Sequence, residues 1–153
     1  MMSTKLIDIL QQKLLHDIPL TQYMGIRVSH YCNNELHINA SLEKNINHRQ
    51  TAFGGSISSL ATLAGWGIVY LKFQELNIKA GIVIQQGNTN YLLPITNDFT
   101  AVCKIDSLAD FDKFITTLKR KGVARIKLNV SVMCNAQLAA EFSGVFVAKM
   151  IAD

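Results

Sequence analysis

The stretch SISSLATLAGWGIVYLKFQEL, residues 56–76, decides the fold of this protein. It is too long for a strand, most of its residues are small or apolar, and its first carboxylate is Glu75. A helix that is apolar nearly all round has to be buried on most of its faces. At about 1.5 Å per residue it is about 30 Å long, enough to cross a small domain. We therefore expect one long helix at the centre of the protein.

Segments with a period of two lie on both sides of this helix and predict strands. The longest alternation of apolar with polar or charged residues runs from Ala124 to Val132. The expected strands cover residues 26–32, 36–42, 80–94, 99–108, 123–134 and 137–150.

The remaining segments complete the expected architecture. Leucines at helical spacing predict an N-terminal helix over residues 3–17, which Pro19 stops. Asn33-Asn34 and Asn135-Ala136 predict tight turns between paired strands. Residues 112–121 fit either a short helix or a basic loop. This order predicts an α+β protein, in which an antiparallel sheet of about six strands wraps around the long helix, with the N-terminal helix beside it.

The composition is that of a globular protein. The 153 residues fit one domain, residues 1–153, and 49% of them are hydrophobic and 17% charged. Cys32, Cys103 and Cys134 show no framework spacing, so we expect small core hydrophobes in a reducing cytoplasm. No apolar run approaches the roughly 18 residues of a membrane span. The polar N-terminal residues do not fit a signal peptide, so a cytoplasmic location is expected.

The chain carries a net charge of +4, with a local excess of basic residues in its last third. Such an excess is usually a solvated face. It could also receive an acidic carrier protein or the phosphates of coenzyme A. Nucleic acid is not expected as a partner, because no aromatic residues interleave with the charges, and the histidines lack metal-ligand spacing. The basic residues are Lys113, Lys119, Arg120, Lys121, Arg125 and Lys127.

The loop before the long helix, NINHRQTAFGGS at residues 45–56, is the candidate site. Gly54 and Gly55 would let a ligand approach the backbone closely, and the first N–H groups of a helix have no internal partners. With Ser56 they could present N–H donors to a developing oxyanion. The alternative is a tight turn with Ser56 as the N-cap. A nucleophilic Ser56 is not favoured, because no G-x-S-x-G elbow surrounds it.

Asn45, Asn47 and His48 are the other polar candidates in this loop. Asparagine commonly forms loops, and its amide can also donate to a carbonyl oxygen. A general base at His48 would need an orienting acid. The first turns of the adjoining helix supply no such acid.

Four motifs, taken together, resemble one known family. They are Asn45-Ile46-Asn47, Thr51-Ala52-Phe53-Gly54-Gly55-Ser56, Leu63-Ala64-Gly65-Trp66-Gly67 and Tyr91-Leu92-Leu93-Pro94. With the predicted elements, they are similar to the family named for the C-terminal domain of YiiD, in the hot-dog superfamily of acyl-thioesterases. The resemblance implies a curved antiparallel sheet around one long helix. It also implies a homodimer or a dimer of dimers, with active sites at the subunit interface.

The resemblance also bears on the reaction. Hot-dog thioesterases of the phenylacetate-degradation type carry His-Gly-Gly and an acid seven residues later, and Phe53 and Thr62 stand at these positions here. Hydrolysis needs an activated water, whereas decarboxylation needs donors aimed at the thioester oxygen and an apolar wall. We therefore expect decarboxylation of malonyl-acyl carrier protein to acetyl-acyl carrier protein, in support of fatty-acid synthesis. The alternatives are an acyl-CoA or acyl-carrier-protein thioesterase and a non-catalytic acyl-thioester binding module.

Residue roles follow from the loop and from the resemblance. The family's key asparagine matches Asn47, which would orient or polarise the thioester carbonyl. The N–H groups of Gly55 and Ser56 would hold the enolate oxygen, and Thr62 and Thr51 would orient the carboxylate or relay the proton. Further substrate contacts are expected at Asn45, His48, Thr51, Phe53, Gly54 and Tyr91. No cofactor is expected, because the substrate carries its own phosphopantetheine on acyl carrier protein or coenzyme A.

Overall fold

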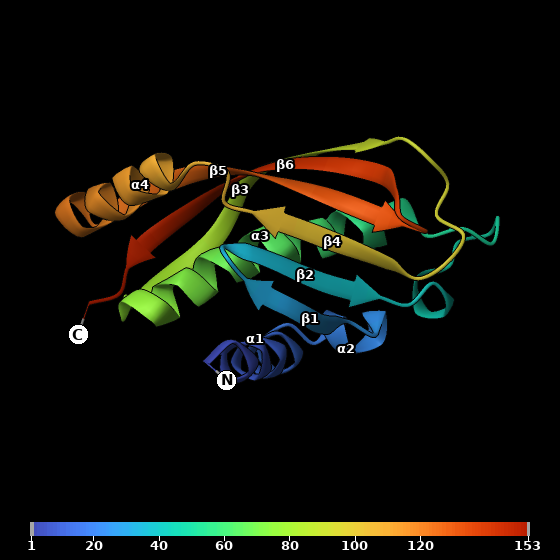
Figure 1. The fold of residues 1–153 in the computed structure, drawn as a ribbon, viewed down its shortest axis with the longest axis horizontal. Coiled ribbons are helices and arrows are strands. Elements are labelled where there is room, and N and C mark those ends of the chain that lie inside the picture. Colours follow the sequence, from blue (N-terminus) through green and yellow to red (C-terminus); the bar gives the residue numbers. More distant parts are fainter. Residues whose placement is uncertain (1, 153) are drawn as a thin grey trace.

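A computed structural model describes residues 2–152 (Figure 1). The helices are α1 (Met2–Asp17), α2 (Leu20–Met24), α3 (Gly54–Leu76) and α4 (Leu108–Lys121), with a short 3-10 helix η1 at Glu43–Asn45. The strands are β1 (Arg27–Cys32), β2 (Glu35–Ala40), β3 (Ala80–Tyr91), β4 (Phe99–Lys104), β5 (Val123–Cys134) and β6 (Gln137–Met150).

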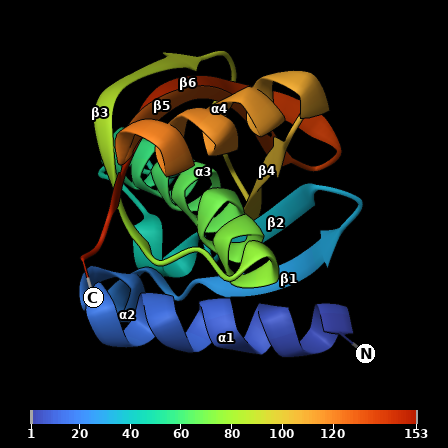
Figure 2. The same ribbon diagram turned by 90° about the vertical axis from the view of Figure 1, so that its left-hand side faces the viewer.

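The six strands form one antiparallel sheet in the order β1-β2-β4-β5-β6-β3. The sheet curves around α3, and α1 packs against β1 and α3 on the open side (Figures 1 and 2). The predicted α+β fold, with a curved sheet around one long helix and a helix at the N-terminus, is therefore confirmed.

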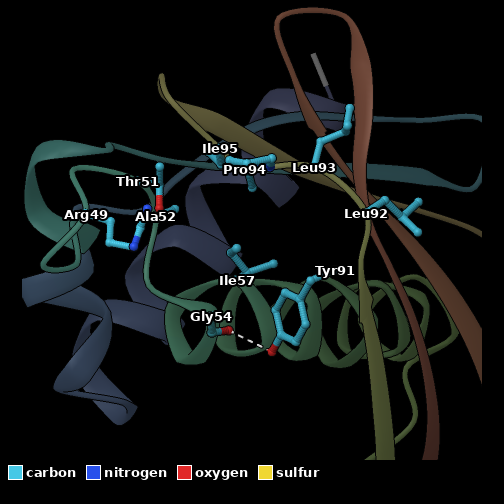
Figure 3. Close-up of a pocket in the computed structure, with 10 residues that line it drawn as sticks. All are labelled: Arg49, Thr51, Ala52, Gly54, Ile57, Tyr91, Leu92, Leu93, Pro94 and Ile95. Carbon is cyan, nitrogen blue, oxygen red and sulfur yellow. Dashed lines mark hydrogen bonds between the residues drawn. The ribbon is translucent and has the colours of Figure 1, made fainter.

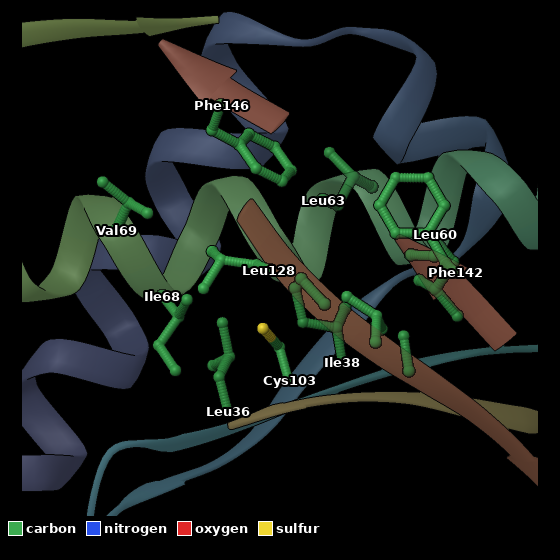
Figure 4. Close-up of a cluster of buried hydrophobic side chains, with 14 of the residues drawn as sticks. Leu36, Ile38, Leu60, Leu63, Ile68, Val69, Cys103, Leu128, Phe142 and Phe146 are labelled. Carbon is green, nitrogen blue, oxygen red and sulfur yellow. The ribbon is translucent and has the colours of Figure 1, made fainter. Parts of the chain in front are cut away.

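Helix α3 is the centre of the core, as its sequence predicts. It contacts β2, β3, β4, β5 and β6, and buried side chains point from it in several directions (Figure 4). The neighbouring Ile68 and Val69 are both fully buried, whereas one stripe of the helix, which includes Thr62, Trp66 and Tyr70, stays partly exposed. Nε1 of Trp66 donates to the Ile82 carbonyl at 2.9 Å and fixes β3 to the helix. Within residues 2–152, no helix is long and apolar enough to cross a membrane.

Strand β1 is tied to the far end of α3. The buried Tyr31 donates its hydroxyl to Glu75 Oε1 at 2.9 Å. Burial, followed by this bond to the carboxylate, raises the pKa of Tyr31, so the phenol stays a donor at neutral pH. The turn at Asn33-Asn34 has positive φ at both residues, which is the predicted hairpin geometry.

A bulge in β1 makes one prediction about the cysteines wrong. The pairing register shifts between Val28 and His30, so Tyr31 faces the core and Cys32 faces solvent. Cys103 and Cys134 are buried as expected, and burial raises the pKa of Cys103 to about 12.

The segment between β4 and β5 also differs from the prediction. Strand β4 ends at Lys104 rather than at residue 108, and residues 108–121 form the helix α4. The Ser107 hydroxyl accepts the Asp110 N–H at 3.1 Å and caps the start of α4, and Gly122 ends it with φ of 77°. The short helix α2, which follows directly after Pro19, is not predicted from the sequence.

Gly65→Ala is expected to destabilise the protein, although this change normally stabilises a helix by about 0.5–1 kcal/mol. A β-carbon at Gly65 would lie 2.5 Å from Cζ of the fully buried Phe146. Overpacking of this kind costs about 1–3 kcal/mol. Urea unfolding measures the change, and Gly81→Ala is the control, because its β-carbon would come no closer than 4.0 Å to Lys149 O. A higher free energy of unfolding for Gly65→Ala would contradict the packing described here.

Candidate active site

The loop between η1 and α3 is anchored by Asn45. This side chain is only 3% exposed, and its Nδ2 donates to the Met24 carbonyl at 2.8 Å and to the Ser41 carbonyl at 2.7 Å. Its backbone carbonyl accepts the Phe53 N–H at 2.7 Å, which closes the loop at its base. The buried Asn45 amide nitrogen thus already bonds two backbone carbonyls and anchors the loop, and Asn45 is not among the residues that line the cavity described below.

Asn47 organises the tip of the same loop. Its Oδ1 accepts the N–H groups of Arg49 at 2.8 Å and Thr51 at 3.2 Å. Its Nδ2 donates to Thr51 Oγ1 at 3.0 Å and lies 3.4 Å from the Ala52 carbonyl. These bonds form an Asx turn, closed by an Asn47 N–H bond to the Thr51 carbonyl at 2.8 Å. The side chain thus holds Thr51 and Arg49 in place.

The start of α3 provides the free backbone donors. Phe53 is the N-cap, so Gly54 and Gly55 are the first two helical residues. Within residues 2–152, no acceptor is bonded to the N–H of Gly54 or of Gly55, as expected for the first turn of a helix. The N–H of Ser56 instead donates to the Phe53 carbonyl at 2.9 Å. The predicted donor pair therefore shifts by one residue, from Gly55 and Ser56 to Gly54 and Gly55, and Ser56 is not the N-cap.

A cavity of about 580 Å³ opens beside this loop (Figure 3). Three predicted site residues, Thr51, Gly54 and Tyr91, line it. Arg49 also lines it, and sequence reasoning missed this residue. The available signal was its spacing from Asn47, since an Asx turn places the residue two positions on beside the same amide. The full lining is Arg49, Thr51, Ala52, Gly54, Ile57, Tyr91, Leu92, Leu93, Pro94 and Ile95.

Tyr91 connects the end of β3 with the start of α3. Its hydroxyl donates to the Gly54 carbonyl at 3.0 Å (Figure 3). A β-carbon at Gly54 would lie 3.4 Å from the tyrosine ring. A β-carbon at Gly55 would collide with the ring of Phe53. A larger residue at Gly55 would therefore displace the exposed Phe53 ring, whereas one at Gly54 would meet the tyrosine ring at ordinary contact distance.

The other predicted residues do not line this cavity. His48 and Phe53 are exposed, and Phe53 keeps 57% of its surface accessible. Thr62 lines a separate groove of about 280 Å³, between α3 and the α1–α2 corner, and its hydroxyl donates to the Ser58 carbonyl at 2.8 Å. One protomer thus places Thr51 and Thr62 in two different hollows. The groove is lined by Ile18, Leu20, Thr21, Met24, Ser58, Ser59, Thr62 and Leu63.

The chemistry of the cavity wall is specific. The lining combines the hydroxyl-bearing Thr51 and Tyr91, Gly54 at the start of α3 and the guanidinium of Arg49 with the apolar Ile57, Leu92 and Leu93. Among its lining residues there is no histidine, cysteine, aspartate or glutamate. In residues 2–152, no three such side chains come together as potential metal ligands. The site can donate hydrogen bonds to an oxyanion but offers no residue of its own as a general base.

Comparisons with known proteins agree with this fold. The family model described as "Putative thioesterase (yiiD_Cterm)" matches residues 7–150. A protein of unknown function from Chlorobaculum tepidum is 32% identical, with a TM-score of 0.94 and 97% of each chain covered. A protein described as a "putative thioesterase" from Shewanella oneidensis is 33% identical, with a TM-score of 0.87, 95% of this chain and 99% of that chain covered. The hot-dog fold expected from the resemblance is thereby shown.

Asn47→Ala is expected to loosen the loop tip, because the N–H groups of Arg49 and Thr51 both lose their acceptor. At about 1 kcal/mol per bond, amide hydrogen exchange at these two residues becomes about five- to tenfold faster. Asn47→Asp keeps the accepting oxygen and should preserve most of the protection. His48→Ala is the control, since the exposed His48 side chain makes no hydrogen bond within the described residues. Equal protection in Asn47→Ala and the wild type would refute the role of Asn47.

Proposed function

Because the chain belongs to the YiiD C-terminal-domain family of thioesterase-like hot-dog proteins, we propose that it decarboxylates a malonyl thioester to the acetyl thioester. The carrier in this proposal is acyl carrier protein, and the product can prime fatty-acid synthesis. The supporting observation is the cavity wall, which combines oxyanion donors with an apolar face and contains no histidine or carboxylate among its lining residues.

Decarboxylation suits this wall because it needs neither an attacking water nor a base. The bond between the α-carbon and the carboxylate breaks, and its electron pair moves into the thioester carbonyl to form an enolate. Carbon dioxide leaves, and the enolate then takes up a proton at carbon. The enzyme's contribution is to stabilise the enolate oxygen with preorganised donors.

Thr51 and Gly54 are the proposed donors to this oxygen. Asn47 Nδ2 donates to Thr51 Oγ1 at 3.0 Å, and the Thr51 hydroxyl in turn donates to Asn47 Oδ1 over a longer 3.3 Å. In this proposal the threonine proton leaves that longer bond and turns to the substrate oxygen. The N–H of Gly54 lies at the start of α3, where the helix dipole adds partial positive charge. Asn47 therefore acts through Thr51 in this proposal, rather than by touching the carbonyl itself.

Tyr91 strengthens a third hydrogen-bond donor, the backbone N–H of Gly55. Its hydroxyl bonds to the carbonyl of Gly54, which belongs to the same peptide unit as the N–H of Gly55. Hydrogen bonds in a chain polarise one another, so this bond makes the Gly55 N–H a stronger donor. We assign Tyr91 to this positioning role in place of a direct bond to substrate.

Arg49 and the apolar wall divide the recognition of the malonyl group. The exposed Arg49 attracts anions to the cavity, both the malonyl carboxylate and the phosphate of the pantetheine arm. Ile57, Leu92 and Leu93 provide a surface that does not solvate a carboxylate, which favours its departure as carbon dioxide.

Thioester hydrolysis is the second candidate, because the family model and the Shewanella relative are both described with the words "putative thioesterase". It requires a group that activates water, and such a group would have to come from outside the cavity described here. His48, next to Arg49 in the loop, and a residue of a second subunit are the available sources.

The first test follows the carrier by mass. Purified protein incubated with malonyl-acyl carrier protein should leave acetyl-acyl carrier protein, which intact-protein mass spectrometry detects as the loss of one carbon dioxide. Thr51→Val should lower kcat/KM about 10- to 100-fold, since a hydrogen bond to a charged oxygen contributes about 1.5–3 kcal/mol. Thr116→Val, on the exposed surface of α4, is the matched control and should keep full activity.

Two outcomes of this assay would overturn the proposal. Release of free carrier protein would identify a hydrolase. An unchanged malonyl-acyl carrier protein would favour the non-catalytic binding module. Full turnover by Thr51→Val would remove the assignment of Thr51 even if the reaction is correct.

We also propose a homodimer formed through strand β3. This strand lies at one edge of the sheet and pairs only with β6 within the described residues. It is twelve residues long, and Val83 remains 63% exposed and Ile84 38% exposed. A long edge strand with exposed apolar side chains is a template for further pairing. A two-fold dimer of this kind would also bring the Thr62 groove of one protomer toward the cavity of the other.

The expected mass by light scattering is twice the 17.0 kDa of one chain, or a higher even multiple if dimers pair. The dimer should persist at micromolar concentration, because the edge of β3 supplies backbone hydrogen bonds in addition to its apolar contacts. A single-chain mass at this concentration would contradict the proposal.

A further inference from the structure

The convex face of the sheet, opposite α3, carries a group of residues that the proposed reaction does not use. On β5, Arg125 and Lys127 point outward, while the alternating Ala124, Ile126 and Leu128 are buried. Arg125 pairs with Val147 on β6, which pairs with Val83 on β3. Lys127 pairs in the same way with Val145. We call Val83, Arg125, Lys127, Val145 and Val147 the convex basic face.

This face joins an apolar strip to positive charge. Paired residues of neighbouring strands lie about 5 Å apart, so the three valines form one strip beside the two cations. Val83 is 63% exposed, and Val145 and Val147 are partly exposed. Lys149 follows on β6, where it pairs with Gly81, and is also exposed.

The charge of this face is not neutralised by the chain itself. Among residues 2–152, none of the ion pairs involves Arg125 or Lys127. Arg125 Nε donates to the neutral Gln85 Oε1 at 3.0 Å, which orients the guanidinium without compensating it. Two carboxylates lie nearby without forming an ion pair in the described part of the chain: Asp110 shares a hollow with Lys113, Arg125 and Lys127, and Asp106 lines a second hollow with Lys127.

The positive charge of the convex basic face determines which kind of partner protein can bind there. A second copy of this chain, placed against the same face about a two-fold axis, would set Arg125 and Lys127 against their own counterparts, and like charges across an interface are costly. A partner with an acidic, partly apolar surface would match both the cations and the valine strip. We propose that the convex basic face receives an acidic carrier protein that presents its thioester to the cavity; this rests on the proposed function.

The position of the face permits delivery in the proposed dimer. Two identical edge strands related by a two-fold axis pair antiparallel, so the start of β3 lies beside the end of its partner's β3. The step from β5 through β6 and β3 to the partner's β3 is about 15 Å, at about 4.8 Å per strand. Along one β3, Val83 and Tyr91 are eight residues apart, or about 27 Å. The face is therefore nearer to the partner's cavity than to its own.

The test compares two substrates that share the reacting group. The double variant Arg125→Glu/Lys127→Glu should lower kcat/KM for malonyl-acyl carrier protein at least tenfold, chiefly through KM. Its kcat/KM for malonyl-pantetheine, which has no protein part, should stay within twofold of the wild type. The matched control is Lys5→Glu/Arg27→Glu, which makes the same change in net charge at exposed sites on α1 and β1. Thermal unfolding verifies that both variants fold.

Direct binding separates this inference from the reaction. Titration of unloaded acyl carrier protein should show binding to the wild type that weakens at least tenfold in Arg125→Glu/Lys127→Glu and is unchanged in the control. That pattern supports the docking face even if no carbon dioxide is released. Equal losses on both substrates, or undiminished binding and turnover of the carrier protein by the variant, would overturn the docking face while leaving the reaction intact.

Discussion

The burial of most of the surface of α3 is the constraint on which the rest of the structure depends. An apolar helix of 23 residues cannot be covered by a flat sheet, so the six strands curve around it and α1 closes the open side. The helix packs so closely against the sheet that a β-carbon at Gly65 would collide with Phe146, and one at Gly67 would collide with Leu36. The first turn of this helix lies beside the cavity, which Gly54 and Ile57 help to line.

The two asparagines of the loop hold the backbone that leads into this first turn. Asn45 is buried and fixes the base of the loop to the α2–β1 and β2 connections, whereas Asn47 fixes the tip around Arg49 and Thr51. Donors held in this way do not need to reorganise when charge develops on a substrate oxygen. The rigidity of the loop is therefore part of the proposed chemistry, and it uses side-chain amides rather than ionised groups.

The sequence predicts much of this fold, because the responsible signals are local. The apolar run of α3, the alternation in β5 and the Asn33-Asn34 turn each identify their element. The β1 bulge and the early end of β4 are not visible locally, since pairing with neighbouring strands determines both. The candidate site likewise combines features that local sequence predicts with features that tertiary contacts determine. The loop and its glycines are predictable, but the bonds of Asn45 and Ser56 and the separation of Thr62 from the cavity depend on tertiary contacts.

The distribution of charge gives a second reason for proposing decarboxylation rather than hydrolysis. The cavity has Arg49 and no carboxylate in its lining, so it attracts a substrate that ends in a carboxylate. Loss of carbon dioxide removes that negative charge from the bound group, and the acetyl product loses the attraction that brought its precursor in. Hydrolysis would instead create a new carboxylate next to the same guanidinium, and the guanidinium would hold this product in the cavity. A rim arginine facing a cavity without acids therefore suits a reaction that consumes a carboxylate.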